Sequence, residues 1–280
     1  MKRIRRGFTL VEVSLFLAIT AAIFVSIAVG TQNSIFQQRY NDAVQNFAEF
    51  LRSIYSQVAN VQSEGDGRSG YAIYGKLVNF EKDDNGNNKI TTYNIVGNVA
   101  EDDLGNDNVL ERLKKLNADV VLNKSDGGKN KYEPVGFVEN YRPRWASQIQ
   151  TTKGWNAVPA GSYEVFTGAL LVVRHPSSGT VYTFSSNKSV DVDSYIESLT
   201  NGFNTGGTLI AANIGNFSAD GVDFCVNPNG AERSTLRRDI RIVAGARNAT
   251  GVEIIADGEN WIGEGANRKN IGNKCNVENE

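Results

Sequence analysis

The sequence is poor in the residue types that most often build catalytic and metal-binding centres. Among its 280 residues there are one histidine, His175, and two cysteines, Cys225 and Cys275. A single histidine, placed before a proline in a predicted turn, leaves no Ser-His-Asp or Cys-His arrangement to assign. Two thiols without a nearby histidine do not make up a zinc site. The sequence therefore predicts neither an enzyme nor a resident cofactor.

Long hydrophobic sequence is confined to the N-terminus. Residues 8–30 form a 23-residue stretch whose only charge is Glu12, and it follows four basic residues, Lys2, Arg3, Arg5 and Arg6. A helix needs about 20 apolar residues to cross a bilayer, and the basic cluster should stay on the cytoplasmic side. We therefore expect a single-pass membrane segment with the rest of the chain exported. A cleavable signal peptide would have a shorter apolar part, and residues 28–30 offer only a weak site for its removal.

The residues around the start of this stretch resemble a known processing site. Gly7-Phe8-Thr9-Leu10-Val11-Glu12 is similar to the cleavage site of type IV prepilins and of the pseudopilins of type II secretion. In that family a membrane peptidase cuts after the glycine and methylates the new N-terminal residue. The resemblance implies a leader of residues 1–7, cleavage between Gly7 and Phe8, and methylation of Phe8. It also implies a long N-terminal helix followed by a strand-rich head.

Glu12 is the one ionisable residue of the predicted membrane segment. Such a residue costs a few kcal/mol on insertion scales, so it suggests a function and a partner. Cleavage before Phe8 would create an amine that is largely cationic at neutral pH, and Glu12 lies about one helical turn beyond it. In the family this glutamate pairs with the terminal amine of a neighbouring subunit during assembly. The alternative is an ordinary signal anchor whose carboxylate reaches the interface.

The helix is expected to continue beyond the membrane, over residues 31–62, which contain neither proline nor glycine. Apolar residues form one stripe at heptad spacing, while polar residues that include Gln38, Asp42, Gln45 and Glu49 fill other faces. Gly30 is the expected point of bending. One amphipathic face suits a covering sheet; the alternative is a parallel homodimeric coiled coil. The stripe consists of Tyr40, Val44, Phe47, Leu51, Ile54, Val58 and Val61.

Residues 63–280 are predicted to form one mostly antiparallel β-sheet head, in which the sheet covers the long helix and gives an α+β fold. Residues 63–69 read as a linker and 123–131 as a polar loop. Glycine is frequent, at 28 residues, which favours short strands joined by tight turns. Helices are expected at 108–116 and 189–199, and strands at 71–80, 89–99, 168–174, 179–185, 221–226, 236–245 and 251–255.

Two further features of the head are candidate sites. Cys225 and Cys275 lie in the exported part, where an oxidising environment favours a disulfide between them. Asp83, Asn85 and Asn87 alternate as the oxygen ligands of calcium loops do, but Gly86 is misplaced and no glutamate stands at the twelfth position. A solvated hairpin turn is the preferred interpretation of these three residues, and the sequence predicts no other metal site.

A basic stretch near the C-terminus is the candidate for DNA binding. Without the leader the side chains carry a net charge of −6, which does not suggest general affinity for nucleic acid. Some minor pilins nevertheless bind DNA through basic residues of their C-terminal part, and a charged sheet edge is the alternative interpretation. The stretch comprises Arg233, Arg237, Arg238, Arg241 and Arg247.

Taken with the resemblance, these features predict a type IV pilus filament subunit, major or minor, held in the membrane before assembly and displayed at the cell surface afterwards. The implied partners are the prepilin peptidase, other pilin subunits, the pilus assembly platform and membrane lipid. The alternatives are a minor pilin that acts as a tip adhesin or DNA receptor, with DNA or a host or surface ligand as partner, and a type II secretion pseudopilin.

Overall fold

The computed structural model describes residues 9–60, 71–98, 109–126, 129–136, 138–151, 164–175, 178–202, 207–227, 238–255, 261–262, 269–270 and 275. The chain divides into two compact units, residues 1–42 and 43–280, and each is described by itself. The predicted leader, with Gly7 and Phe8, and the predicted linker at 63–69 lie outside the described residues. Helix α1 (Leu10–Ala59) begins in the first unit and ends in the second.

In the first unit α1 is a continuous helix that exposes its apolar side chains. It runs through Gly30 without a break. Its small hydroxyl side chains are satisfied by its own backbone: Thr20, Ser26 and Thr31 each donate to the carbonyl four residues earlier, at 2.6, 2.8 and 2.9 Å. These three hydroxyl groups therefore have acceptors within the helix, which suits a helix surrounded by lipid or by other helices.

In the second unit α1 carries the members of the predicted apolar stripe from Val44 to Val58, which are buried by the chain's own head; Val61 lies outside the described residues. Phe47, Leu51 and Ile54 are fully buried, and Val44 and Val58 are nearly so. This confirms packing on the head over the coiled-coil alternative. The Tyr55 hydroxyl is 2.9 Å from Thr183 Oγ1, which donates at 2.7 Å to the carbonyl of Ala246. These hydrogen bonds connect the helix to two segments of the head that are far apart in the sequence, around residues 183 and 246.

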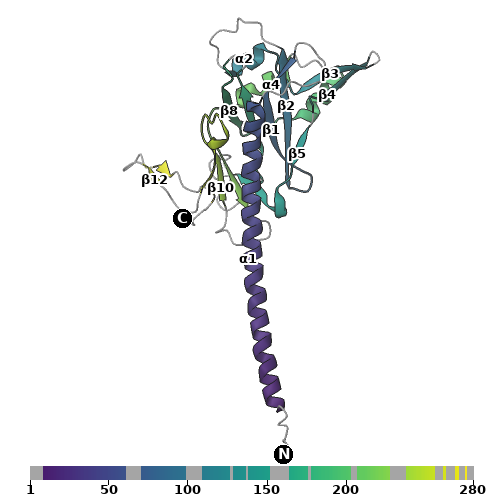
Figure 1. Ribbon diagram of the computed structural model, residues 1–280. Helices are drawn as coiled ribbons and strands as arrows, with labels where there is room; N and C mark the ends of the chain where they lie inside the picture. Colours follow the sequence, from purple (N-terminus) through teal and green to yellow (C-terminus); the bar gives the residue numbers. More distant parts are fainter. Residues whose placement is uncertain are drawn as a thin grey trace, which may run out of the picture. The chain divides into compact units, whose positions relative to one another are not determined.

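The larger sheet has five antiparallel strands in the order β5-β2-β1-β7-β8 (Figure 1). Alternate residues of β8 face opposite sides: Thr183 meets Tyr55 of α1, whereas Phe184 joins a core that includes Leu113, Tyr195 and Leu209 of the three short helices. The strands are β1 (Tyr71–Lys82), β2 (Asn88–Asn98), β5 (Glu139–Tyr141), β7 (Gly168–Arg174) and β8 (Val181–Ser186); the helices are α2 (Val109–Lys115), α3 (Val192–Thr200) and α4 (Leu209–Asn213).

The prediction of one sheet is wrong, because a second antiparallel sheet runs in the order β11-β10-β9-β6. The side chain of Asn88 connects the two sheets by making the pair of hydrogen bonds that a neighbouring strand would make. It donates to the carbonyl of Ile149 at 2.9 Å and accepts from the N–H of Ile149 at 2.8 Å. In the sequence this asparagine reads as a turn residue, so the junction is not visible there. The strands are β6 (Gln148–Thr151), β9 (Val222–Asn227), β10 (Arg238–Ile242) and β11 (Val252–Ile255).

Two small hairpins complete the described strands. The predicted polar loop at 123–131 is instead largely a hairpin of β3 (Val121–Asp126) and β4 (Lys129–Pro134). Apart from Val121, Leu122 and Tyr132 these strands consist mostly of polar residues, so they lack the alternation that identifies a half-buried strand. The second hairpin pairs β12 (Trp261–Ile262) with β13 (Lys269–Asn270). Three short 3-10 turns, η1 (Arg144–Ala146), η2 (Ile214–Asn216) and η4 (Ala249–Gly251), connect other strands.

Candidate functional site

The start of α1 holds Glu12 in a reciprocal hydrogen-bonded cap. The Glu12 carboxylate accepts from the backbone N–H of Thr9 at 2.8 Å and from its hydroxyl at 3.0 Å. The Glu12 N–H in turn donates to Thr9 Oγ1 at 3.3 Å. This is a capping box, in which two N-terminal donors of a helix are satisfied by side chains. The sequence analysis missed this role of Thr9, although the Thr-x-x-Glu spacing is its known signature.

The first unit presents a long apolar surface beyond this cap. Its large side chains from Leu10 to Ile35 are exposed, for example Leu10 at 86% and Phe24 at 71%. By length and composition α1 is the one described helix that could cross a membrane, with a mean hydropathy of 2.4 over its most apolar window. Exposed apolar side chains on this scale require a covering of lipid or protein. Gly7 and Phe8, the predicted cleavage and methylation residues, lie outside the described part of the chain.

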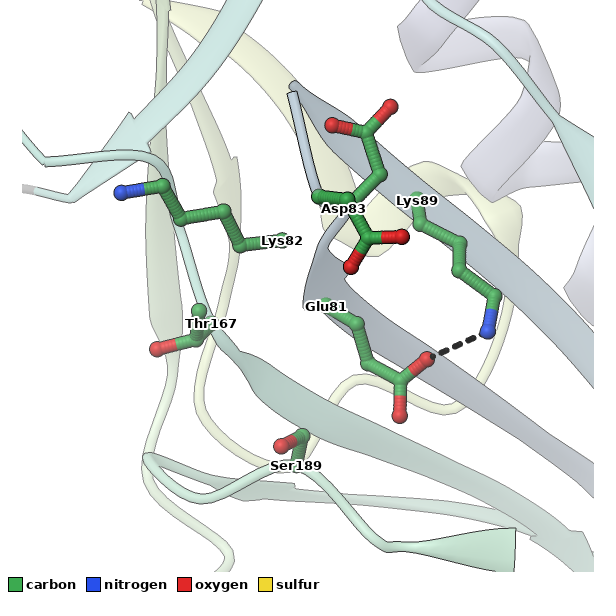
Figure 2. Close-up of a pocket in the computed structure, with 7 residues that line it drawn as sticks. Glu81, Lys82, Asp83, Lys89, Thr167 and Ser189 are labelled. Atoms are coloured by element: carbon green, nitrogen blue, oxygen red, sulfur yellow. Dashed lines mark ion pairs between the residues drawn. The ribbon is translucent and has the colours of Figure 1, made fainter. Parts of the chain in front are cut away.

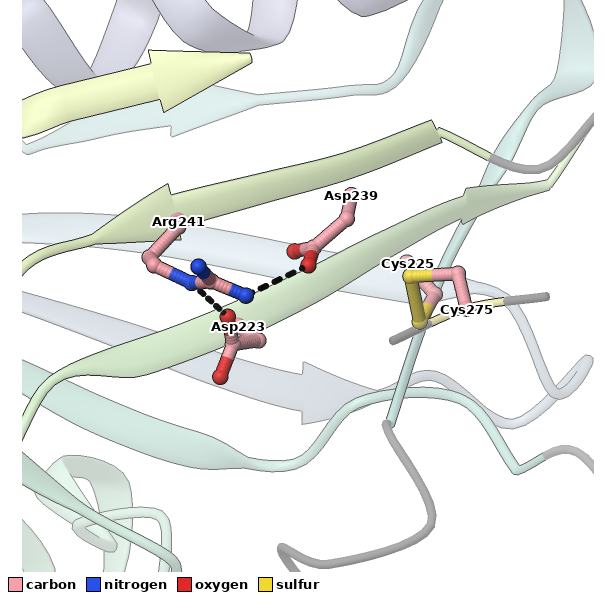
Figure 3. Close-up of a disulfide and its surroundings, with 5 residues drawn as sticks. All are labelled: Asp223, Cys225, Asp239, Arg241 and Cys275. Atoms are coloured by element: carbon pink, nitrogen blue, oxygen red, sulfur yellow. Dashed lines mark hydrogen bonds and ion pairs between the residues drawn. A yellow bond between two sulfur atoms is a disulfide. The ribbon is translucent and has the colours of Figure 1, made fainter. Parts of the chain in front are cut away.

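Cys225 and Cys275 form the predicted disulfide, which closes a sequence separation of 50 residues. Cys225 lies in β9, and both cysteines are almost completely buried. Figure 3 shows the bond beside β9, on the side of the sheet that also carries Asp223 and Arg241. The disulfide therefore fastens the C-terminal end of the chain onto the second sheet.

Arg241, one of the five arginines proposed to bind DNA, is engaged within the head. Its Nε donates to Asp223 and its Nη2 is 3.2 Å from the Asp239 carboxylate (Figure 3). Only 15% of its side chain is exposed, and Asp239 is fully buried. Burial opposes the charge, but the two carboxylates outweigh it and raise the pKa of the guanidinium. Two anions that already hold this cation make it a poor phosphate ligand.

Of the other arginines of the stretch, the structure describes Arg238 and Arg247, and each has separate surroundings. Arg238 opens β10 and is half-buried. Arg247 is exposed and lies 5.7 Å from the centre of the Tyr182 ring, on a strand of the other sheet. Arg233 and Arg237 lie outside the described residues. The structure thus brings no two described arginines of the stretch together as a basic surface, and DNA binding stays a prediction.

Asp83, the first residue of the weak calcium candidate, closes its own turn. Its Oδ1 accepts from the N–H groups of Asn85 at 3.0 Å and Asn87 at 2.7 Å, and Gly86 adopts the left-handed conformation with φ of 81°. These contacts are those of a hairpin turn, the preferred interpretation of the sequence. Within the described residues no group of three histidine, cysteine or acidic side chains could hold a metal ion.

An open hollow of about 410 Å³ lies beside this turn and is lined in part by Glu81, Lys89 and Ser189. Figure 2 shows the Lys89 ammonium directed at the Glu81 carboxylate across its rim, at 3.2 Å. Asp193 lies 3.7 Å from the same ammonium. The Lys89 ammonium is thus matched by two carboxylates, and Lys82, Asp83 and Asp84 also line the hollow.

His175 has the local structural role expected of a turn residue. It follows β7, and its Nδ1 accepts from the Ser178 N–H at 3.2 Å, within the turn that leads to β8. Burial, followed by the nearby Arg112, lowers the pKa of the imidazole. The ring therefore stabilises the hairpin as a neutral acceptor.

Asp119 is a buried acid that the sequence analysis did not single out. Its carboxylate accepts from the Tyr195 hydroxyl and the Val120 N–H, each at 2.8 Å, and from the Leu209 N–H at 3.3 Å. Burial raises the pKa of the carboxyl despite these donors. The group ties α3 and α4 to the larger sheet, so its role is structural.

Comparisons with protein-family models, with curated proteins and with solved structures found no match.

Proposed function

We propose that this chain is a structural subunit of a type IV pilus-like filament. In this role the part of α1 that lies in the first unit anchors the chain in the membrane. Gly7 is the cleavage residue, and the helices of many copies pack together after cleavage. The head, residues 63–280, is displayed on the outside of the filament. The proposal includes three kinds of subunit: a major pilin, a minor pilin and a secretion pseudopilin.

The observation that carries the proposal is the contrast between the two parts of α1. From residue 43 onward the apolar face of the helix is buried by the head, whereas Leu10 to Ile35 expose their large apolar side chains. A membrane anchor alone needs about 20 such residues. Glu12 within this apolar sequence adds a feature that a simple anchor does not require, because a charge there weakens insertion.

The capping box allows a test that separates two roles of Glu12. Glu12→Gln keeps a side-chain oxygen acceptor at the N3 position of the capping box but removes the charge. Thr9→Ala removes the hydroxyl from the cap but leaves the charge of Glu12. If Glu12 pairs with the amine of a neighbouring subunit, Glu12→Gln should be cleaved and remain in the membrane yet enter filaments poorly, whereas Thr9→Ala should assemble.

The measurement is the amount of each full-length variant in sheared filaments relative to the membrane fraction. Equal losses for Glu12→Gln and Thr9→Ala would assign Glu12 to helix capping. Normal assembly of Glu12→Gln would contradict the charge-pairing role. The absence of the unaltered chain from any filament would contradict the proposed function itself.

DNA reception is the weaker second function. Arg241 forms ion pairs with Asp223 and Asp239. A DNA-binding surface would therefore have to consist of the remaining arginines of the stretch. We therefore favour the structural subunit over the DNA receptor.

A further inference from the structure

The head presents a single tryptophan to solvent in an unusual backbone turn. In the described part of the second unit, Trp145 is the one large hydrophobic side chain that is mostly exposed, at 54%. Trp145 and Ala146 both adopt left-handed backbone conformations, with φ of 56° and 52°, which non-glycine residues seldom do. Ser147 closes the turn, because its N–H and its hydroxyl both donate to the Arg144 carbonyl, at 3.1 and 2.8 Å.

Two exposed cations precede this tryptophan in the same loop. Arg142 and Arg144 are both exposed and belong to the same connection between β5 and β6. Tryptophan and arginine are among the residue types enriched at the centres of protein interfaces. The loop from 142 to 146 therefore has the chemistry of a docking surface for an acidic partner.

The loop is held beside one segment of α1, residues 46–50. Tyr141, immediately before it, donates from its hydroxyl to Asn46 Oδ1 at 2.9 Å. The Tyr141 ring stacks on Phe50 with 4.3 Å between centroids and lies 5.8 Å from the ring of Phe47. The tryptophan and its arginines are thus held next to residues 46–50 of the helix.

The outward face of the same helix carries the complementary charge. Asp42, Gln45 and Glu49 are exposed and lie at spacings of three and four residues, so they share one side of α1. That side is opposite to the buried Phe47 and Leu51. The two acids are about 10 Å apart along the axis at 1.5 Å per residue, a span that two arginines can cover.

We infer that the 142–146 loop of one copy docks on the Asp42–Gln45–Glu49 face of α1 in a neighbouring copy. Arg142 and Arg144 pair with the two carboxylates, and the Trp145 ring covers the stem of Gln45 between them. The inference rests on the proposed function, because parallel packing of α1 helices brings the two surfaces together. A loop held at the height of residues 46–50 meets residues 42–49 of a neighbour that is displaced by only a few residues along the axis.

Disulfide crosslinking in cells tests this contact and leaves the tryptophan and both arginines intact. The full-length variant Gln45→Cys/Ala146→Cys places one thiol in the acidic face and one in the loop. The native cysteines are already bonded to each other. Mild oxidation of cells that display filaments should give a ladder of linked subunits. Each single variant, and the pair Gln45→Cys/Glu197→Cys with its second thiol on the exposed surface of α3, should give no ladder.

Charge reversal identifies the interaction behind the crosslink. Arg142→Glu/Arg144→Glu, added to the crosslinking pair, should abolish the ladder, and the further change Asp42→Arg/Glu49→Arg should restore it. Trp145→Ala should weaken the contact about 30-fold, the loss expected for a central interface tryptophan. Retention of the Cys225–Cys275 bond and of a protease-resistant head checks that each variant is folded.

The outcomes of the two proposals are distinguishable. Filaments that form normally but give no ladder, or a ladder that is indifferent to charge reversal, would overturn the docking contact and leave the filament role standing. If the arginine or tryptophan variants instead lose binding to an added polyanion or glycan while filaments stay crosslinked, the loop has another occupant, and the docking inference is likewise wrong. If the unaltered chain enters no filament, both proposals fall.

Discussion

Loss of the Cys225–Cys275 disulfide should destabilise the head by a margin that the loop length sets. The bond closes a separation of 50 residues, for which the chain-entropy model gives about 4 kcal/mol. For a domain of this size that corresponds to a fall in melting temperature of about 8–16 °C. The stabilisation acts through the unfolded chain, because the bond removes conformations that the reduced chain can reach.

The assay is thermal unfolding of the detergent-solubilised full-length protein, followed by near-ultraviolet circular dichroism. Unaltered protein is compared before and after reduction in denaturant and refolding, and the Cys225→Ala/Cys275→Ala variant is measured beside it. Both sulfur atoms are almost completely buried, so reductant alone should leave the folded protein oxidised, whereas reductant with denaturant should not. Equal melting temperatures for the oxidised and reduced protein would refute the loop-entropy reasoning.

Substitutions at Leu51, Gly75 and Asp119 test the packing of the head. Leu51→Ala should lower the unfolding free energy by about 2–5 kcal/mol, because the side chain is fully buried. Ile35→Ala, on the exposed part of α1, should change the unfolding free energy of the head by no more than about 0.5 kcal/mol. Denaturant titration measures both values, and equal effects would be inconsistent with the described burial. Gly75→Ala should be strongly destabilising, because its Cβ would lie 2.2 Å from the Val172 carbonyl oxygen, and a normal melting temperature would contradict that close approach. Burial raises the pKa of Asp119 above 3.8, so folding takes up a proton between that value and the folded pKa, and stability rises as pH falls through this window. Asp119→Asn should flatten this dependence and be at least as stable near pH 7, while Asp119→Ala should lose about 1–3 kcal/mol through its unpaired donors; an unchanged pH profile in Asp119→Asn would assign the dependence to other groups.

The elements with strong local signals could be predicted from the sequence. The heptad spacing from Val44 to Val58 gave the buried face of α1, because one side of a helix recurs every three to four residues. The hairpin of β7 and β8 was predicted from two apolar runs around a turn. The disulfide was predicted from two cysteines in a segment that is expected to be exported.

What the sequence did not reveal depends on tertiary contacts. Asn88 joins the two sheets through a pair of side-chain hydrogen bonds to Ile149, and an asparagine in a Gly/Asn-rich turn carries no sign of this partner. The strands β3 and β4 contact the core through Val121 and Tyr132, but their mostly polar sequences show no alternation. Arg241 appeared as part of a basic stretch because its counterions include Asp223, eighteen residues away in the chain and directly opposite in the sheet.

The capping box lies between these two cases. Thr9 and Glu12 have the spacing of the motif, so the sequence contained the signal, but the similarity to a prepilin cleavage site directed attention to assembly. Both roles can coexist in one residue, since the cap uses the carboxylate oxygens within the chain and assembly uses the charge toward a neighbour. The Glu12→Gln and Thr9→Ala pair separates them.

The most direct test of the central claim, that this chain is a processed filament subunit, is the N-terminal mass of the protein isolated from the cell surface. The account predicts a chain that has lost residues 1–7 and begins with N-methylated Phe8, and whose mature helix is intact through Gly30. A chain that retains Met1 and the basic leader, or one that begins near residue 30 after removal of the whole apolar segment, would contradict it.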